Sequence, residues 1–233
     1  MTRREELAES LARVRERISA ACAAAGRDPD EVTLVVVTKY FPASDVRLLA
    51  ELGVTDVGEN RHQEALAKAE ECADVPVRWH FIGNLQSNKA AAVSSYAHVV
   101  ESVDRAKLVG PLGRGAQEHD RILDVLVQVG LDRPGAAGER SGIDPDQVSA
   151  LADLVATAPG LRLRGLMAVA PLDEDPRPAF ARLARIRSEL LAGHPSADWL
   201  SAGMSGDLEA GIEVGATHVR VGRAVLGERP SIK

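Results

Sequence analysis

Short runs of β-branched and other apolar residues alternate along this chain with longer stretches of helical periodicity. The first helical stretch covers roughly residues 5–25 and places Leu7, Leu11, Val14 and Ile18 at spacings of three and four, which predicts a helix with one apolar face. The apolar run Thr33–Thr38 follows and predicts a strand buried on both faces. Further strands are predicted near residues 54–58, 77–82, 98–102, 122–129, 163–170, 199–202 and 218–221, with helices near 42–52, 63–72, 89–95, 105–117, 146–156, 178–191 and 208–214.

This alternation predicts the fold class. Eight strand–helix units within roughly 200 residues favour a compact (β/α)₈ TIM barrel over an open doubly wound sheet. An open sheet that binds a dinucleotide should carry GxGxxG after its first strand, and no such motif is present. We therefore expect residues 1–233 to form a single domain, with the barrel at about 32–228 and an extra N-terminal helix at about 5–25.

Composition excludes several classes of function. The chain has 233 residues, a formal net charge of −6 and only 3% aromatic residues, so we do not expect nucleic acid as a partner. The first residues lack the apolar stretch of a signal peptide, and no apolar run approaches the roughly 20 residues of a membrane span. Cys22 and Cys72 stand far apart, outside any CxxC motif, and unpaired thiols favour a cytoplasmic location.

Lys39 directly follows the first apolar strand. On a barrel of this kind, residues at the carboxyl ends of the strands face the active-site mouth. Apolar walls would lower the pKa of an amine there, and a neutral amine attacks carbonyl groups to form a Schiff base. The alternative is a strand-end lysine whose ammonium group extends to solvent.

A second candidate feature follows the last two predicted strands. Gly203–Asp207 precedes a predicted helix, and Arg220–Ala224 includes Gly222 and Arg223. Many barrels hold a phosphate in these two loops. Ser205 would donate its hydroxyl group there and Gly222 and Arg223 their backbone amides, with Met204 as a lesser contact. Alternatively, Ser205 only caps the helix and the glycines only form turns.

A reactive lysine and a phosphate site together indicate either pyridoxal 5′-phosphate or a sugar phosphate with a carbonyl group. Asn60 and His80 are lesser candidates, because each has an ordinary structural role available, as a helix cap and as a hydrogen-bonded core residue. Arg220 would reach a pyridine nitrogen or pair with a buried carboxylate. No HExxH motif and no cluster of Cys and His indicates a metal site. The glycine-rich segment 130–142 would lie at the barrel mouth, as a lid or as a simple connection.

Several segments resemble one family in their order and spacing. These are Val35–Lys39, Gly58–Asn60, Arg164–Met167, Gly203–Ser205 and, most specifically, Trp79–Lys89. They are similar to the pyridoxal phosphate homeostasis proteins, which are related to the N-terminal barrel of alanine racemase. The resemblance covers about residues 32–227. It implies a fold-type III barrel that holds the vitamin B6 cofactor as a Schiff base on Lys39, with its phosphate at Ser205, Gly222 and Arg223 and with Arg220 at the pyridine nitrogen.

The resemblance also implies cofactor handling without established catalysis, with pyridoxal phosphate-dependent apoenzymes as recipients and a monomer or weak dimer. Arg223 stands where the family usually has threonine, and Gly206 replaces an acidic residue. A racemase would need a second acid–base group, and strand alternation predicts that Tyr40 points away from Lys39. We do not expect the second domain that supplies such a group in alanine racemase. A cofactor-free aldolase is the weakest alternative, since only Glu59 is expected near Lys39.

Overall fold

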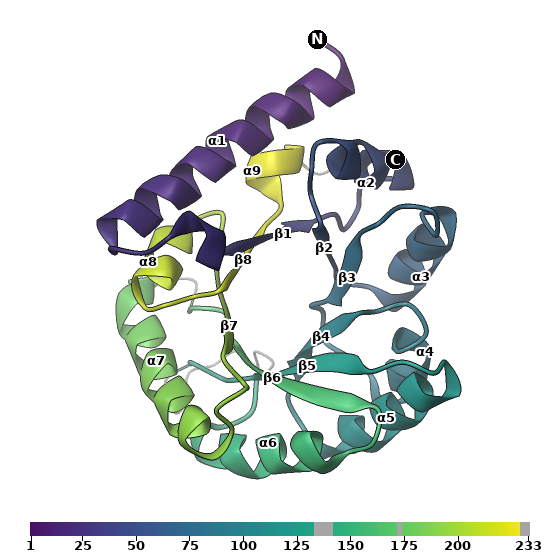
Figure 1. Ribbon diagram of the computed structural model, residues 1–233, viewed down its shortest axis with the longest axis vertical. Helices are drawn as coiled ribbons and strands as arrows, with labels where there is room; N and C mark the ends of the chain where they lie inside the picture. Colours follow the sequence, from purple (N-terminus) through teal and green to yellow (C-terminus); the bar gives the residue numbers. More distant parts are fainter. Residues whose placement is uncertain (133–141, 172–173, 229–233) are drawn as a thin grey trace.

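The strands of this chain pair in sequence order and close on themselves. The computed structural model describes residues 1–132, 142–171 and 174–228. Within these ranges eight parallel strands form a closed barrel, since β1 pairs with both β2 and β8 (Figure 1). The strands are β1 (Thr33–Val37), β2 (Asp56–Glu59), β3 (Arg78–Phe81), β4 (Val99–Val103), β5 (Leu123–Gln128), β6 (Leu161–Met167), β7 (Trp199–Met204) and β8 (His218–Val221). The predicted (β/α)₈ barrel is confirmed.

The helices alternate with the strands and form the outer layer (Figure 1). They are α1 (Arg3–Ala24), α2 (Ala43–Glu51), α3 (His62–Glu71), α4 (Ala90–Val93), α5 (Val109–Glu118), α6 (Val148–Thr157), α7 (Pro176–Gly193), α8 (Leu208–Glu213) and α9 (Arg223–Leu226), with 3₁₀ turns η1 (Pro29–Glu31), η2 (Ser87–Lys89), η3 (Ala106–Leu108) and η4 (Pro145–Gln147). Three predicted helices, at 89–95, 105–117 and 146–156, begin instead as 3₁₀ turns. In α5 the early Pro111 offers no backbone N–H and is tolerated only in the first turn.

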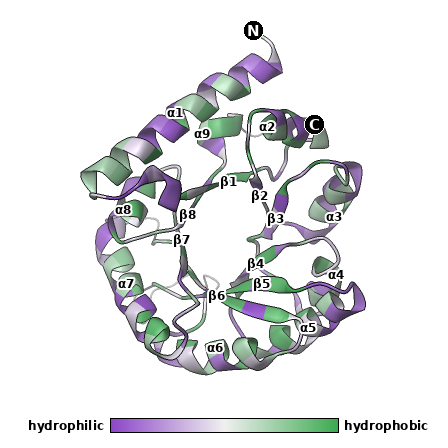
Figure 2. Cartoon of the chain, viewed as in Figure 1, coloured by the Kyte–Doolittle hydropathy of each residue, from purple (hydrophilic) through white to green (hydrophobic). Residues whose placement is uncertain are grey.

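The predicted N-terminal helix is confirmed as α1, which lies outside the barrel along α8 and α9 (Figure 1). A capping box between Thr2 and Glu5 begins it. Leu7, Leu11, Val14, Ile18 and Cys22 form its buried face. Figure 2 shows the matching alternation of hydrophilic and hydrophobic residues along the helix. The N-terminal segment is therefore anchored to the last part of the barrel.

Seven of the eight strands differ from their predicted bounds by one to three residues at an end, and β6 and β7 end furthest from the predicted positions. β6 ends at Met167 rather than at Ala170, and β7 continues to Met204 rather than ending at Ala202. The register between β5 and β6 shifts at Gly165, whose φ is 149°. A Cβ atom at Gly165 would lie 1.9 Å from the carbonyl oxygen of Trp199, so only glycine permits this approach of β6 to β7. The predicted segment 130–142 falls mainly on residues 133–141, outside the described ranges.

Candidate functional site

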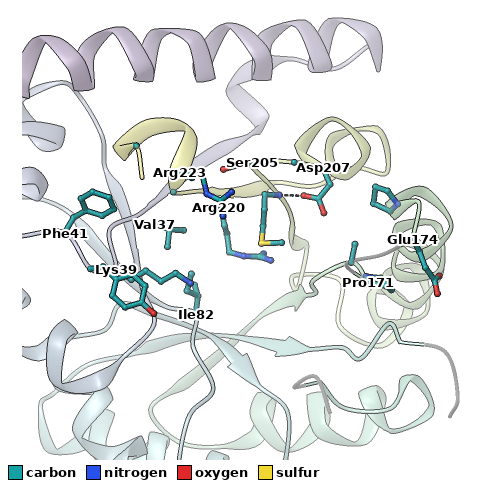
Figure 3. A pocket seen from close by; sticks show the side chains of 17 residues that line it. Val37, Lys39, Phe41, Ile82, Pro171, Glu174, Ser205, Asp207, Arg220 and Arg223 are labelled. Atoms are coloured by element: carbon teal, nitrogen blue, oxygen red, sulfur yellow. Dashed lines mark hydrogen bonds between the residues drawn. The ribbon is translucent and has the colours of Figure 1, made fainter. Parts of the chain in front are cut away.

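A cavity of about 480 Å³ opens at the carboxyl ends of the strands (Figure 3). In this fold that end of the barrel carries the functional residues, because the strand-to-helix loops meet there. Its walls come from the segments after β1, β3, β6, β7 and β8. The lining residues are Val37, Lys39, Tyr40, Phe41, Ile82, Ala170, Pro171, Glu174, Pro176, Met204, Ser205, Gly206, Asp207, Arg220, Gly222, Arg223 and Gly227.

Lys39 lies in the cavity wall two residues beyond the end of β1 (Figure 3). Tyr40 has a φ of 72°, in the left-handed region that a non-glycine residue rarely adopts. The backbone N–H of Tyr40 donates to the carboxylate of Glu64 in α3. The prediction that Tyr40 points away from Lys39 is wrong, since both residues line the cavity. Strand alternation does not apply there, because the chain has already left the extended conformation.

A buried ion cluster lies behind this turn. The ammonium group of Lys68 donates to the carbonyl oxygen of Thr38 at 2.9 Å, to Glu59 Oε1 at 2.6 Å and to Glu64 Oε1 at 3.2 Å. Glu59 also accepts from the hydroxyl group of Thr38 at 2.6 Å. Burial raises the pKa of the Glu59 carboxyl despite its partners Lys68 and Thr38. The sequence analysis did not identify Lys68. The i, i+4 spacing of Glu64 and Lys68 was the available signal.

The residues predicted to bind phosphate meet at one side of the cavity. Ser205, Gly222, Arg223 and Met204 all line it, and Figure 3 shows Ser205 and Arg223 on the same side. The backbone N–H of Met204 donates to Asp207 Oδ1 at 2.6 Å, which holds this carboxylate against its own loop. A Cβ atom at Gly222 would lie 3.2 Å from the carbonyl oxygen of Val37. Glycine at position 222 thus lets the turn after β8 approach β1, beside Lys39.

Arg220 reaches the cavity from β8 and is only 4% exposed. Its guanidinium group donates to Ser201 Oγ at 2.6 Å and to the carbonyl oxygen of Ala168 at 2.9 Å. Glu101 Oε2 lies 3.8 Å from Arg220 Nη1. Burial lowers the pKa of Arg220, while the Glu101 carboxylate opposes that change. The two roles considered for Arg220 are thus compatible, because the guanidinium group both approaches a buried carboxylate and forms part of the cavity wall.

His80 and Asn60 are not among the residues that line this cavity. His80 is buried inside the barrel, with Nε2 2.8 Å from Asp56 Oδ1 and Nδ1 2.7 Å from Glu101 Oε1. Asn60 follows β2, and its backbone packs so closely against Gly83 that a Cβ atom there would lie 2.0 Å from the Asn60 oxygen. The structure therefore separates these two candidates from the other predicted site residues.

The sequence analysis missed Glu101 and Ser201. Ser201 Oγ donates to Glu101 Oε2 at 2.6 Å, although the two residues are 100 positions apart. Both lie within predicted strands, 98–102 and 199–202, and the one signal in the sequence is a charged residue inside an apolar strand. Among the described residues, no helix is long and apolar enough to cross a membrane. Nor does any group of His, Cys, Asp and Glu in that part of the chain form a candidate metal site.

Comparison with known proteins shows that this chain is similar in sequence to one protein family. Residues 10–230 match the family described as alanine racemase, N-terminal domain. A Pseudomonas aeruginosa protein named pyridoxal phosphate homeostasis protein is 44% identical over 223 residues, which cover 96% of each chain. A Mycobacterium tuberculosis protein of the same name is 43% identical over 243 residues, covering 97% of this chain and 94% of that protein.

A solved structure shares both the fold and the sequence similarity. PipY of Synechococcus elongatus PCC7942, described as having PLP bound, superposes with a TM-score of 0.81 at 33% identity. The match covers 95% of this chain and 100% of PipY. The family match over residues 10–230 includes all eight strands of the barrel.

Proposed function

This chain belongs to the alanine racemase N-terminal domain family and, within it, to the pyridoxal phosphate homeostasis proteins, and on this premise we propose that it binds pyridoxal 5′-phosphate at Lys39 and takes part in the homeostasis of that cofactor. The observation that carries the proposal is that Lys39, Ser205, Arg220, Gly222 and Arg223 line one cavity.

The residues present fit the cofactor. When bound, pyridoxal phosphate supplies an aldehyde whose carbon forms a C=N bond to a primary amine with loss of one water. Lys39, which lines the cavity, would supply that amine. The hydroxyl group of Ser205, the guanidinium group of Arg223 and the backbone amides at Gly222 and Arg223 are donors suited to a phosphate. The close approach of Gly222 to Val37 supports this placement, because a larger residue would crowd the wall beside Lys39.

Arg220 supports handling of the cofactor rather than turnover. A guanidinium group has no acceptor and remains charged, so a pyridine nitrogen facing it stays unprotonated. An unprotonated ring withdraws electrons weakly, which disfavours carbanion chemistry at a bound amino acid. We accordingly propose that Arg220 and Lys39 hold the cofactor without an established reaction of their own. Recipient apoenzymes, a monomer or weak dimer, and a cytoplasmic location consistent with the unpaired Cys22 and Cys72 belong to the same proposal.

One observation favours a second candidate function. Tyr40 lines the cavity next to Lys39, which supplies a second side chain able to exchange a proton, as a racemase-like enzyme requires. An assay of α-proton exchange from alanine in deuterated water, with wild-type protein and Tyr40→Phe, tests it. Exchange that depends on Tyr40 would establish turnover.

A cofactor-free aldolase would need an acidic group to act with Lys39, and Glu59 was the expected one. The structure does not favour this alternative, because Glu59 Oε1 accepts hydrogen bonds from Thr38 and Lys68.

The proposed function is tested by adding pyridoxal phosphate to the protein, recording the visible absorbance spectrum before and after borohydride, and mapping the modified peptide by mass. Borohydride delivers hydride to the C=N carbon and leaves a stable secondary amine, so the adduct marks the lysine that formed the bond. We expect a band that bleaches and an adduct on Lys39. Lys39→Ala should lose both, whereas Lys107→Ala, which removes an exposed lysine, should keep both. A wild-type protein that the cofactor does not colour would overturn the proposal.

A further inference from the structure

A row of buried polar side chains crosses the barrel interior and ends at the cavity. Asp56 of β2 contacts His80 of β3, and His80 contacts Glu101 of β4. Glu101 accepts from Ser201 of β7 at 2.6 Å, and Ser201 in turn accepts from Arg220 of β8 at 2.6 Å. Each member is at most 4% exposed. Five strands thus contribute to one connected row.

The charges in this row alternate in sign. Burial disfavours a charge on His80, yet its hydrogen bonds to Asp56 and Glu101 outweigh that effect and raise its pKa. Burial likewise disfavours the Glu101 carboxylate, but His80, Arg220 and Ser201 bring its pKa to about 2. Burial lowers the pKa of His218 and of His98, both near the row, to about 4, which keeps the two rings neutral. At the two ends of the row, Arg78 lies 3.7 Å from Asp56 and the Asp207 carboxylate raises the pKa of Arg220 against the effect of burial. Both ring nitrogens of His80 face carboxylate oxygens, and only the protonated ring donates from both, so Glu101 is an anion between two cations.

Both carboxylate oxygens of Glu101 are held. Oε1 contacts His80, and Oε2 contacts Ser201 while lying 3.8 Å from the guanidinium group of Arg220. A buried polar group that keeps all its partners has one favourable orientation, because losing a partner costs the desolvation of that group. Arg220 is thus constrained in direction by Ser201 and Ala168, and its charge is offset by Glu101.

We propose that Glu101 and Ser201 are positioning residues that act through Arg220, fixing the direction of its guanidinium group and moderating the positive field it exerts in the cavity, with His80 and Asp56 anchoring Glu101 from behind. This inference rests on the proposed function, since the quantity that it sets is the environment of bound pyridoxal phosphate. None of the four residues lines the cavity, so each acts without touching the ligand.

The experiment compares wild-type protein with Glu101→Gln and Ser201→Ala. Three quantities are measured for each: the melting temperature without ligand, the affinity for pyridoxal phosphate, and the pH midpoint of the visible absorbance change of the loaded protein. Glu101→Gln keeps the shape of the side chain but removes the charge that offsets Arg220. Because the cavity then becomes more positive, the pH midpoint should fall, by on the order of one unit for a charge at this distance.

Ser201→Ala removes the hydroxyl group that holds both Arg220 and Glu101 Oε2, while the charge of Glu101 and its contact with His80 remain, so it tests the proposal even where Glu101→Gln does not fold. We expect about tenfold weaker binding and a displaced midpoint, as for a lost hydrogen bond to a charged group. Ser201→Thr, which retains the hydroxyl group, should restore both. The matched control is Ser94→Ala, since Ser94 is equally buried but bonds only to the carbonyl oxygens of Ala90 and Leu112. Ser94→Ala should lower the melting temperature without changing the affinity for pyridoxal phosphate or the pH midpoint.

The outcomes separate the two proposals. If wild-type protein binds the cofactor while Ser201→Ala and folded Glu101→Gln keep its affinity and midpoint, the row is merely structural and the inference is overturned. If wild-type protein does not bind pyridoxal phosphate at all, the proposed function fails and this inference fails with it.

Discussion

Lys68 and Glu59 form an ion pair of 2.6 Å that is almost completely buried, with exposed side-chain fractions of 5% and 1%. The pair lies directly behind the turn that carries Lys39, because Lys68 also donates to the carbonyl oxygen of Thr38. A buried carboxylate that loses its cation is costly. The position of the proposed anchor lysine therefore depends on a second lysine that never reaches the cavity.

Lys68→Met should destabilise the protein by about 3–5 kcal/mol, the usual cost of breaking a buried ion pair from one side. Chemical denaturation with urea measures this change. The double variant Glu59→Gln/Lys68→Met should recover part of the loss, because no uncompensated charge stays buried. Lys107→Met, at an exposed lysine, is the control and should change the free energy of unfolding by less than about 0.5 kcal/mol. If Lys68→Met and Lys107→Met lowered the free energy of unfolding equally, the pair of Lys68 and Glu59 would contribute nothing to stability.

Ser205→Ala should weaken the binding of pyridoxal phosphate by about tenfold, as expected for a lost hydrogen bond to a charged group. Attachment to Lys39 should persist, because the lysine is untouched. Titration with pyridoxal, which lacks the phosphate, provides the internal control and should give the same affinity in wild-type and variant protein. An unchanged affinity for the phosphate form would indicate that backbone amides and Arg223 hold the phosphate without the Ser205 hydroxyl.

Arg17 connects α1 to the proposed phosphate loop. Its guanidinium group donates to the carbonyl oxygen of Ser205 at 3.2 Å and forms a bidentate pair with Glu209. Because this pair is partly exposed, Arg17→Ala should reduce stability only slightly. Releasing the Ser205 loop should nonetheless weaken pyridoxal phosphate binding about threefold, which corresponds in free energy to a typical exposed ion pair.

Arg13→Ala is the control for that measurement, since Arg13 lies one turn away on α1 and bonds only to Glu9 and Ser10. It should leave cofactor affinity unchanged. The same loss of affinity in both variants would assign the effect to α1 as a whole rather than to Arg17.

The buried histidines should make the free energy of unfolding depend on pH. Burial lowers the pKa of His218 to about 4, whereas an unfolded histidine titrates near 6.5. Below pH 6.5 the unfolded chain takes up a proton that the folded protein refuses, so the contribution of His218 is complete above 6.5 and is lost as pH falls towards 4. The loss should reach about 3 kcal/mol at most. His98, whose pKa burial also lowers to about 4, adds to it with the same sign.

Above pH 6.5 the sign reverses through His80, whose raised pKa makes the folded protein hold its proton longer than the unfolded chain does. Maximum stability is therefore expected near pH 6.5. Urea denaturation between pH 5 and 8 measures both slopes. His218→Phe, which keeps a ring beside Trp199, whose ring centroid lies 4.4 Å from that of His218, should flatten the acid slope, whereas His119→Gln at an exposed position should not. Identical slopes in the two variants would contradict this assignment.

The sequence predicted the barrel well because its strands are short, apolar and separated by helical stretches of regular length. It also placed Lys39, Ser205, Arg220, Gly222 and Arg223 at strand ends, which the closed barrel then gathers at one cavity. The predicted direction of the Tyr40 side chain was wrong because side chains alternate only inside a strand. The left-handed φ of Tyr40 changes the direction of its side chain.

The interior row was not predictable in the same way. Glu101 and Ser201 belong to strands that no local pattern pairs, and they meet only across the interior of the closed barrel. His80 was considered as a single histidine, without the carboxylates of Asp56 and Glu101 that determine its charge. Contacts between strands so far apart in sequence are set by the closure of the sheet rather than by the residues nearby.

That closure also determines when the cavity comes into existence. The residues that face each other across the seam, such as Thr33 and His218, are separated by nearly the whole barrel, and the proposed ligands Lys39 and Arg220 lie on the two sides of that seam. On the ribosome, Lys39 emerges long before its partners, and the β1–β8 pairing forms late because it joins the two ends of a sheet whose other strands pair with their neighbours in sequence. A nascent barrel therefore carries the lysine of the proposed cofactor site before the site itself exists, and that site is complete only when β8 joins β1.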